Sequence, residues 1–259
     1  MKLLVAAALA AVSFAATAAI KEEPVTYKAG DATLKGFVVY DDAKKGKRPG
    51  MVVVHEWWGI TKHTHSEARR FAQKGYTAFI ADMYGDAKTA DNPKDAGTLM
   101  KGLMGDANAV KARFDAARAA LAKHASVDPK RIAASGYCMG GAVVLNMASA
   151  GEDLKAVAAF HPSLGGYKPA QGALKSKVLV LNGADDPFNK PDQIEAFKKD
   201  MESHKADYKF VNYPGAVHAF TNPEATEAGK KFNIPVAYNA DADKKSKAEA
   251  DKFFASALK

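Results

Sequence analysis

After residue 50, short apolar runs alternate with segments of helical periodicity, and this alternation restricts the possible folds more than any other feature. The apolar runs are typical of buried strands and cover residues 51–55, 76–81, 131–135, 156–160, 177–182 and 208–213. Helical patterns follow at residues 66–74, 106–124, 140–148, 191–204 and 242–258. Alternating strands and helices favour parallel strand pairing through right-handed crossovers. We therefore expect an α/β fold with a mostly parallel sheet flanked by helices.

Three further segments complete the predicted organisation. Residues 24–28 and 33–40 resemble the two strands of an antiparallel hairpin, which we place at the edge of the sheet. In the helix predicted over 106–124, an apolar stripe at helical spacing indicates the buried face, and it consists of Val110, Phe114, Ala117 and Leu121. Residues 84–104 are rich in Asp, Lys and Gly, so we expect a loop that shapes the rim of a pocket.

The first 19 residues have the pattern of a secretory signal peptide. Lys2 supplies the positive start, an apolar run continues to about Ala16, and Ala16-Thr17-Ala18 offers small residues at a cleavage spacing. That apolar run is shorter than the roughly 20 residues of a membrane span, and no later segment is apolar enough. We expect export to the periplasm or outside the cell, and one mature domain over residues 20–259.

Composition narrows the classes of protein further. Hydrophobic residues make up 47% and charged residues 25% of the chain, which excludes a disordered protein. One cysteine cannot form an internal disulfide. The net charge of +8 comes from scattered lysines without a nucleic-acid recognition motif, so we expect a solvated basic surface and neither a nucleic-acid nor a membrane partner. We expect a monomer, with an oligomer left open.

The segment Gly136-Tyr137-Cys138-Met139-Gly140-Gly141 joins a predicted strand to a predicted helix. This is the context of the nucleophile elbow Gly-x-Ser-x-Gly, with cysteine in place of serine. Side chains at positions 136 and 140 would clash in so tight a turn. The turn exposes the central side chain at the start of a helix, where free amides favour a thiolate. We predict Cys138 as the nucleophile and the Met139 amide as part of an oxyanion hole.

An acid and then a histidine follow Cys138 in the order that such hydrolases use. Asp185 comes directly after the strand at 177–182, and His218 follows the strand at 208–213. Ligands of open α/β sheets bind at the carboxyl ends of strands. We predict His218 as the base and Asp185 as the acid that orients it. Asp186 is the alternative acid, and we prefer Asp185 because it comes first after the strand.

Four motifs in this order resemble the dienelactone hydrolase family over roughly residues 30–258: GYCMGG at 136–141, HEWWG at 55–59, NGAD at 182–185 and GAVHAF at 215–220. The resemblance implies the α/β-hydrolase fold and hydrolysis of esters and lactones through a Cys-His-Asp triad. It also implies that Glu56 contacts the resting thiol and helps to activate it, and that the backbone amide of Trp57 completes the oxyanion hole.

The chain departs from the family where its best-known members hold a substrate carboxylate with two arginines. By our alignment these positions are about Leu99 and Asn222, with Lys94 and Lys101 as nearby cations that could replace them. The resemblance therefore does not extend to an anionic dienelactone as the substrate.

The remaining candidate residues come from their place at strand ends. Glu56 lies between an apolar strand and two tryptophans, where a carboxylate is costly unless it is paired or functional. Its neighbour His55 does not begin a zinc motif, because position 59 is glycine and the segment is a strand end. His63 and His65 are expected to be exposed and not a metal pair. Trp58 and His161 are expected to line the substrate pocket.

We therefore expect an exported carboxylic ester hydrolase that cleaves a small-molecule ester, lactone or thioester through an acyl-enzyme, without metal or organic cofactor. Two other classes remain open. The chain could be a thiol redox or ligand-binding protein on a hydrolase scaffold, or a basic surface protein that binds anionic polymers.

Overall fold

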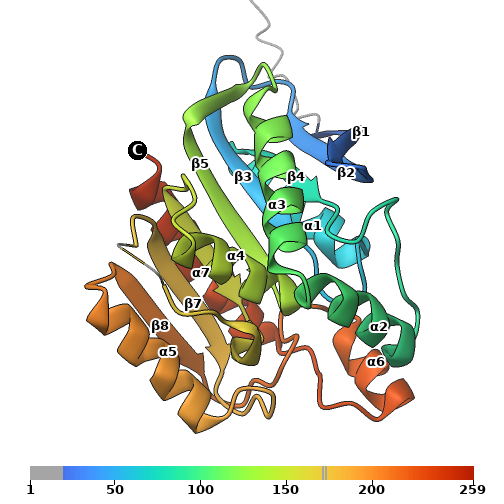
Figure 1. The fold of residues 1–259 in the computed structure, drawn as a ribbon, viewed down its shortest axis with the longest axis vertical. Helices are drawn as coiled ribbons and strands as arrows, with labels where there is room; N and C mark the ends of the chain where they lie inside the picture. The colour runs from blue at the N-terminus through green and yellow to red at the C-terminus, as the bar shows by residue number, and fades with distance from the viewer. Residues whose placement is uncertain (1–19, 171, 173) are drawn as a thin grey trace, which may run out of the picture.

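The computed structural model describes residues 20–170, 172 and 174–259 (Figure 1). The predicted signal segment, residues 1–19, lies outside the described residues. The elements follow one another as β1 (Ile20–Ala29), β2 (Ala32–Asp41), β3 (Arg48–Val54), α1 (Lys62–Gln73), β4 (Thr77–Ala81), α2 (Pro93–Met104), α3 (Ala107–Ala122), β5 (Val127–Tyr137), α4 (Met139–Ser149), β6 (Ala156–Phe160), η1 (Leu164–Gly166), β7 (Lys177–Gly183), α5 (Pro191–Ser203), β8 (Tyr208–Tyr213), α6 (Ala225–Phe232) and α7 (Ala240–Ala257).

The strands form a mixed sheet in the order β1-β2-β4-β3-β5-β6-β7-β8. From β4 to β8 every neighbouring pair is parallel, as the alternation of strands and helices predicted. The hairpin β1–β2 is antiparallel and joins the sheet through an antiparallel contact between β2 and β4. The predicted edge hairpin is therefore confirmed, with both strands longer than their sequence pattern indicated.

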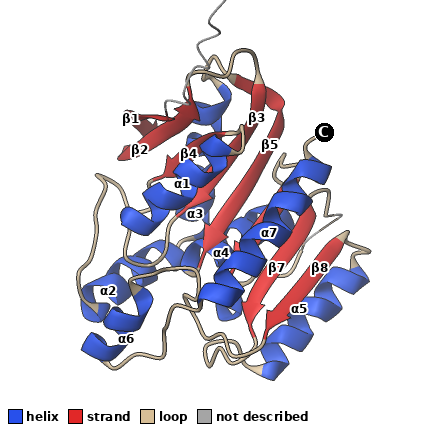
Figure 2. Ribbon diagram, turned by 180° about the vertical axis from the view of Figure 1, so that it is seen from behind, coloured by secondary structure: helices blue, strands red, loops and turns tan. Residues whose placement is uncertain are grey.

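Helices cover both faces of the sheet (Figures 1 and 2). Helices α2, α3, α4 and α5 contribute to the apolar core on one face, and α1 and α7 contribute to the core on the other. The stripe predicted on α3 is confirmed, because its buried residues are Val110, Phe114, Ala117 and Leu121. Strand β3 from Gly50 to Val54 and the whole of β6 are apolar because both of their faces are covered.

Two helices lie where the sequence pattern indicated none. The expectation of a loop over residues 84–104 is wrong in its second half, where α2 begins at Pro93 with Asn92 as its N-cap. Helix α6 lies between β8 and α7, in a stretch without a predicted element. Only two residues of each helix are buried among the described residues, so neither carries a full apolar stripe. Both helices lie beyond the carboxyl edge of the sheet, next to each other (Figure 2).

In the part of the chain that the structure describes, no helix combines the length and the apolar character that a membrane crossing requires.

Candidate active site

Cys138 occupies the sharp turn between β5 and α4. Its backbone has φ 54° and ψ −117°, which is a strained conformation for a residue with a side chain. The turn is held on both sides, because the Cys138 amide donates to the Phe160 carbonyl at 3.1 Å and the Cys138 carbonyl accepts from the Ser163 amide at 3.2 Å. Such strain persists only where surrounding contacts enforce it, and it fixes the thiol at the first turn of α4.

The glycines around Cys138 are required by space, as the sequence indicated. A Cβ atom at Gly136 would lie 2.0 Å from the carbonyl oxygen of Gly140. A Cβ atom at Gly140 would lie 2.4 Å from the carbonyl oxygen of Val54. These are contacts with backbone atoms, which cannot turn aside as a flexible side chain can. The turn therefore packs directly against β3, and this contact brings the thiol beside the segment that begins at His55.

His218 lies beside Asp186, and this corrects the prediction of Asp185 as its partner. Nδ1 of His218 lies 2.7 Å from Oδ2 of Asp186, and both side chains are almost completely buried. Asp185 is exposed, and its amide donates to the Ala216 carbonyl at 3.0 Å. The loop after β7 thus uses its first aspartate to anchor the backbone and turns the second inward.

Asp186 is itself held in place by the residues that follow it. Its Oδ1 accepts the Phe188 amide at 2.8 Å, and its Oδ2 accepts from the side-chain amide of Asn189 at 3.4 Å. Because Nδ1 of His218 donates to a fixed carboxylate, the ring presents Nε2 on its other side. Burial alone would lower the pKa of His218, but the nearby Cys138 and Asp186 raise it to about 10. These two neighbours therefore favour a protonated imidazole.

The peptide that joins Glu56 to Trp57 is fixed in orientation. Nδ1 of His55 lies 2.6 Å from the Glu56 carbonyl oxygen, which also accepts the Gly59 amide at 3.2 Å. Nε2 of His55 accepts the Met83 amide at 3.2 Å, so Nδ1 carries the proton. In a planar trans peptide the N–H points opposite to the C=O. Two donors on the Glu56 carbonyl therefore also fix the direction of the Trp57 N–H.

Tyr84 connects the two residues whose amides were predicted to form an oxyanion hole. Its hydroxyl donates to the Trp57 carbonyl at 2.8 Å and lies 3.3 Å from Sδ of Met139. Among the described residues neither the Trp57 amide nor the Met139 amide has a protein acceptor. Met139 begins α4, and the first amides of a helix have no partner within it. Both amides are thus available to an oxygen atom at the site.

Glu56 is buried and its carboxylate is bound by side chains other than the thiol. Oε2 of Glu56 accepts from the side-chain amide of Asn222 at 2.7 Å and lies 3.4 Å from Nδ1 of His63. In the described residues no hydrogen bond joins Glu56 to Cys138, although both line the same pocket. His63, which was expected to be exposed, is buried because it pairs with this carboxylate.

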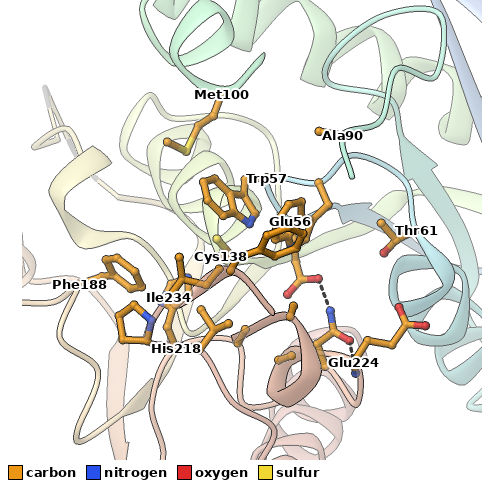
Figure 3. A pocket seen from close by; sticks show the side chains of 18 of the residues that line it. Glu56, Trp57, Thr61, Ala90, Met100, Cys138, Phe188, His218, Glu224 and Ile234 are labelled. Atoms are coloured by element: carbon orange, nitrogen blue, oxygen red, sulfur yellow. Dashed lines mark hydrogen bonds between the residues drawn. The ribbon is translucent and has the colours of Figure 1, made fainter. Parts of the chain in front are cut away.

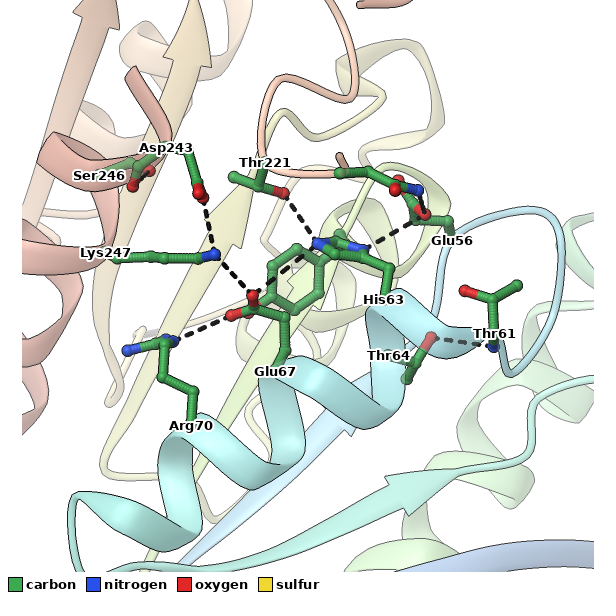
Figure 4. Close-up of polar contacts among 12 residues, drawn as sticks. Glu56, Thr61, His63, Thr64, Glu67, Arg70, Thr221, Asp243, Ser246 and Lys247 are labelled. Atoms are coloured by element: carbon green, nitrogen blue, oxygen red, sulfur yellow. Dashed lines mark hydrogen bonds and ion pairs between the residues drawn. The ribbon is translucent and has the colours of Figure 1, made fainter. Parts of the chain in front are cut away.

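A row of buried charges continues from His63 away from the pocket (Figure 4). Nε2 of His63 lies 3.9 Å from Oε1 of Glu67, which also pairs with Nζ of Lys247 at 2.8 Å. Oε2 of Glu67 accepts from Arg70 at 3.0 Å and from the Tyr137 hydroxyl at 2.9 Å. Burial would raise the pKa of Glu67, but Arg70, Lys247 and His63 lower it to about 2. Glu67 is therefore a stable anion behind His63.

Two carboxylates favour the protonated form of His63. Burial would lower the pKa of this imidazole, but the carboxylates of Glu56 and Glu67 raise it above its ordinary value. Thr221 connects the row to the other side of the site, because its hydroxyl lies 3.3 Å from Nε2 of His63 and 2.8 Å from Nε2 of His161.

His161 does not line the pocket, contrary to the prediction. It is completely buried behind His218, with the two rings 5.4 Å apart and edge to face. Burial holds the pKa of His161 well below its ordinary value, so the imidazole is neutral. His161 supports the ring of His218 from the core side, and Phe188 covers that ring on another side at 5.0 Å.

Cys138 lines a pocket of about 440 Å³ (Figure 3). Glu56, Trp57, Cys138 and His218 converge on it, and Trp58 lines it as predicted. The remaining lining residues come mainly from the two helices that the sequence pattern missed and from the segments beside them: Thr61, Ala90, Asp91, Met100, Ser163, Phe188, Ala219, Asn222, Glu224, Ala225, Ala228, Phe232, Ile234, Pro235 and Val236. Pockets of roughly 300–1,000 Å³ accommodate molecules of drug size.

The positions aligned with the two arginines of the family are occupied differently. Asn222 lines the pocket and binds Glu56, whereas Leu99 packs against the core of the sheet. Lys94 and Lys101 are exposed on α2 and are not among the lining residues.

Residues 221–238 leave the sheet region and return to it at nearly the same point. The amide of Asn239 donates to the Phe220 carbonyl at 3.0 Å, which closes the base of this excursion. Within it, the Ala237 amide donates to the His218 carbonyl at 3.2 Å. The excursion contains α6 and supplies a large part of the pocket wall.

Within the residues that the structure describes, no three His, Cys, Asp or Glu side chains are grouped as a metal site would require.

A buried cysteine at a strand–turn–helix elbow, followed by an acid and a histidine at the carboxyl edge of a mostly parallel sheet, defines an α/β hydrolase. The model of the dienelactone hydrolase family matches residues 34–258, so the chain belongs to this family. It is a carboxylic ester hydrolase of the dienelactone hydrolase type.

Relatives support this assignment over most of the chain. A crystal structure of a dienelactone hydrolase-like promiscuous phosphotriesterase from metagenomic libraries is 33% identical, with a TM-score of 0.87 over 93% of this chain and 100% of that chain. Protein usf of Aquifex pyrophilus is 28% identical over 225 residues, which are 83% of this chain and 96% of the relative. Dienelactone hydrolase from Anabaena variabilis is 16% identical, with a TM-score of 0.65 over 93% of this chain and 99% of that chain, and shares the fold.

Proposed function

We propose that this protein hydrolyses esters or lactones through Cys138, His218 and Asp186, with a covalent acyl-enzyme intermediate. The observation that carries the proposal is the position of His218. Its Nδ1 is bound to the buried Asp186 at 2.7 Å, and its pKa is raised in part by Cys138 on the other side. This is the arrangement of nucleophile, base and orienting acid that cysteine and serine hydrolases share.

Before the reaction the thiol proton rests on Nε2 of His218, in keeping with the raised pKa of this imidazole. In the first half of the reaction the sulfur of Cys138 attacks the substrate carbonyl carbon. The carbonyl oxygen becomes an oxyanion, which the amides of Trp57 and Met139 stabilise. When the tetrahedral intermediate collapses, the bond to the leaving alkoxide breaks, and His218 returns its proton to that oxygen. The products are an alcohol and a thioester on Cys138.

In the second half, Nε2 of His218 takes a proton from water, and the hydroxide attacks the thioester carbonyl. The carbon–sulfur bond then breaks, which releases the acid and restores Cys138. Asp186 holds the imidazole ring in one orientation through both halves and stabilises its charged form. Glu56 places a buried carboxylate next to the Trp57 amide, and Asn222 and His63 bind this carboxylate.

We also propose that the protein acts after export to the periplasm or outside the cell. The support is the sequence of residues 1–19, with its positive start, apolar run and small residues before Ala19. Fractionation of cells that express the whole chain, with a mass measurement of the exported form, tests this. Protein that remains in the cytoplasm with residues 1–19 attached would contradict it.

Hydrolysis of p-nitrophenyl acetate by residues 20–259 tests the catalytic proposal. We expect sustained turnover that Cys138→Ala and treatment with iodoacetamide both abolish, and mass spectrometry of Cys138 should show a transient acetyl group. Circular dichroism of Cys138→Ala controls for folding. Full activity in a folded Cys138→Ala variant would overturn the proposal. A single stoichiometric burst without turnover would also overturn it and favour a reactive thiol with another role.

A further inference from the structure

The ionisable side chains that line the pocket are mostly carboxylates. Three carboxylates line it, those of Glu56, Asp91 and Glu224. In the described part of the chain, no lysine or arginine is among the lining residues, and His218 is the basic group at the thiol. The rest of the wall is apolar, with the rings of Trp57, Trp58 and Phe232 among its larger surfaces.

We propose that the pocket selects substrates that are uncharged and apolar around the reacting carbonyl, and that it discriminates against substrates carrying a carboxylate. This inference rests on the proposed function and specifies the chemical class of its substrate.

The side chain of Asn222 is already occupied by its neighbours in the pocket wall. The side-chain amide of Asn222 donates to Glu56 at 2.7 Å, and its carbonyl oxygen accepts the Glu224 amide at 3.0 Å (Figure 3). Nδ1 of His63 lies 3.4 Å from Oε2 of Glu56 and offsets its charge. Apart from the His218 imidazole, which is bound to Asp186 and faces Cys138, the described lining residues offer a substrate carboxylate no cation, and the carboxylate would lose its hydration against an apolar wall.

The cations closest to the rim do not change this balance. Lys62 lies 3.9 Å from Glu224, but its side chain is 91% exposed and it is not a lining residue. An exposed pair of this kind contributes little. The net charge of +8 on the whole chain acts weakly inside the pocket, because charges farther away than about 8 Å are largely screened at physiological ionic strength.

The apolar wall provides the attractive half of the selection. The rings of Trp57 and Trp58 lie 4.7 Å apart, and Trp58 and Phe232 are 6.0 Å apart. Ile234 and Val236 come from the excursion, and Met100 comes from α2. Burial of an aryl or alkyl group against these side chains is favourable in proportion to the apolar area removed from water.

A matched pair of substrates tests the inference directly. Methyl 4-acetoxybenzoate and 4-acetoxybenzoate have the same reacting acetate and differ in a charged or esterified group on the ring. Each kcat/KM is divided by the rate of hydrolysis by imidazole in the absence of protein, which corrects for the leaving group. We expect the neutral ester to be preferred at least tenfold. Equal ratios, or a preference for the anion, would overturn the inference while Cys138-dependent turnover keeps the proposed function.

A substitution on α6 tests the same point from the side of the protein. Ala228 lines the pocket and is half-buried, so a longer side chain can extend from it along the wall. Ala228→Lys should reduce the preference for the neutral ester at least threefold, whereas Ala228→Met, of similar length, should retain it. An identical ratio in the two variants would contradict a charge-based selection.

Binding without catalysis separates this inference from the proposed function. The two tryptophans of the chain, Trp57 and Trp58, both line the pocket, so tryptophan fluorescence excited at 295 nm reports on it. 3-Phenylpropanamide and 3-phenylpropanoate are nearly isosteric and differ in charge. We expect the amide to bind at least tenfold more tightly. Should neither acetoxy ester be turned over, the proposed function fails, and equal binding of these two ligands would refute the charge selection.

Discussion

Asp186 and His218 are joined by a 2.7 Å contact between two buried side chains, although an exposed aspartate precedes Asp186 in the same turn. The difference between the two neighbours is one of direction. The backbone of Asp185 is bound to Ala216, so its side chain faces solvent and the next side chain faces the core. This relationship gives a matched pair of variants that differ by one position.

Asp186→Asn should reduce kcat by about 10²-fold or more, since the amide no longer stabilises the charged imidazole or its orientation. Asp185→Asn should stay within about twofold of the wild type, as is usual for an exposed substitution away from the reacting groups. Steady-state kinetics with p-nitrophenyl acetate measure both. A larger loss in Asp185→Asn would restore the first aspartate as the orienting acid.

Tyr84→Phe should lower kcat about fivefold with little change in KM. The variant loses the hydrogen bond from the Tyr84 hydroxyl to the Trp57 carbonyl, which contributes about 1 kcal/mol to holding that residue in place. The ring of Tyr84 remains in place, so the pocket keeps its shape. Tyr76→Phe is the control, since the Tyr76 hydroxyl has no hydrogen bond among the described residues. An unchanged kcat in Tyr84→Phe would mean that the oxyanion site does not depend on this hydroxyl.

Gly140→Ala should destabilise the fold by about 3 kcal/mol, because the new Cβ would lie 2.4 Å from the Val54 carbonyl oxygen. Gly97→Ala should instead stabilise it by up to about 1 kcal/mol, since Gly97 is inside α2 and a Cβ there meets nothing within 4 Å. Urea unfolding followed by circular dichroism gives both values. Two variants of equal stability would show that the elbow relaxes more easily than its backbone contacts indicate.

Glu67→Gln should remove a pH-dependent part of the stability. Arg70, Lys247 and His63 outweigh burial and lower the pKa of Glu67 from 4.5 to about 2 in the folded chain. A lowered pKa contributes stability above the unfolded value, and this contribution disappears as the pH falls from 4.5 towards 2. The difference in unfolding free energy between wild type and variant should therefore decrease by about 3 kcal/mol over this range. A difference independent of pH would contradict the ion-pair account.

The main sheet and the elbow could be predicted from sequence because both depend on local pattern. Buried parallel strands are continuous apolar runs, and the turn at Cys138 needs glycine at positions 136 and 140. Helices α2 and α6 escaped prediction because each buries only two residues and therefore lacks an apolar stripe. Asn92 followed by Pro93 was the signal available for α2, since an N-cap before proline at the first helical position is typical of a helix start.

The partners of buried polar groups could not be read from the chain. The choice between Asp185 and Asp186 depends on a backbone hydrogen bond to Ala216, which is a tertiary contact. His63 is seven residues after Glu56 in sequence, yet it is buried because α1 returns it to that carboxylate. His161 ends a strand as predicted, but the ring turns behind His218. Position at a strand end indicates proximity to the site, and packing decides which face a side chain takes.

The closed base of the excursion has an evolutionary consequence. Because the contact between Phe220 and Asn239 closes the base of the excursion, its middle part around α6 can change in length or sequence while β8 and α7 keep their positions. Lengthening such a surface segment costs little free energy, since the entropy of closing a loop grows only slowly with its length. The reacting residues and the part of the pocket wall that α6 supplies thus lie in different segments of the chain. New substrate preferences can therefore arise by changes around α6 alone, without changes in the sheet or in the reacting residues.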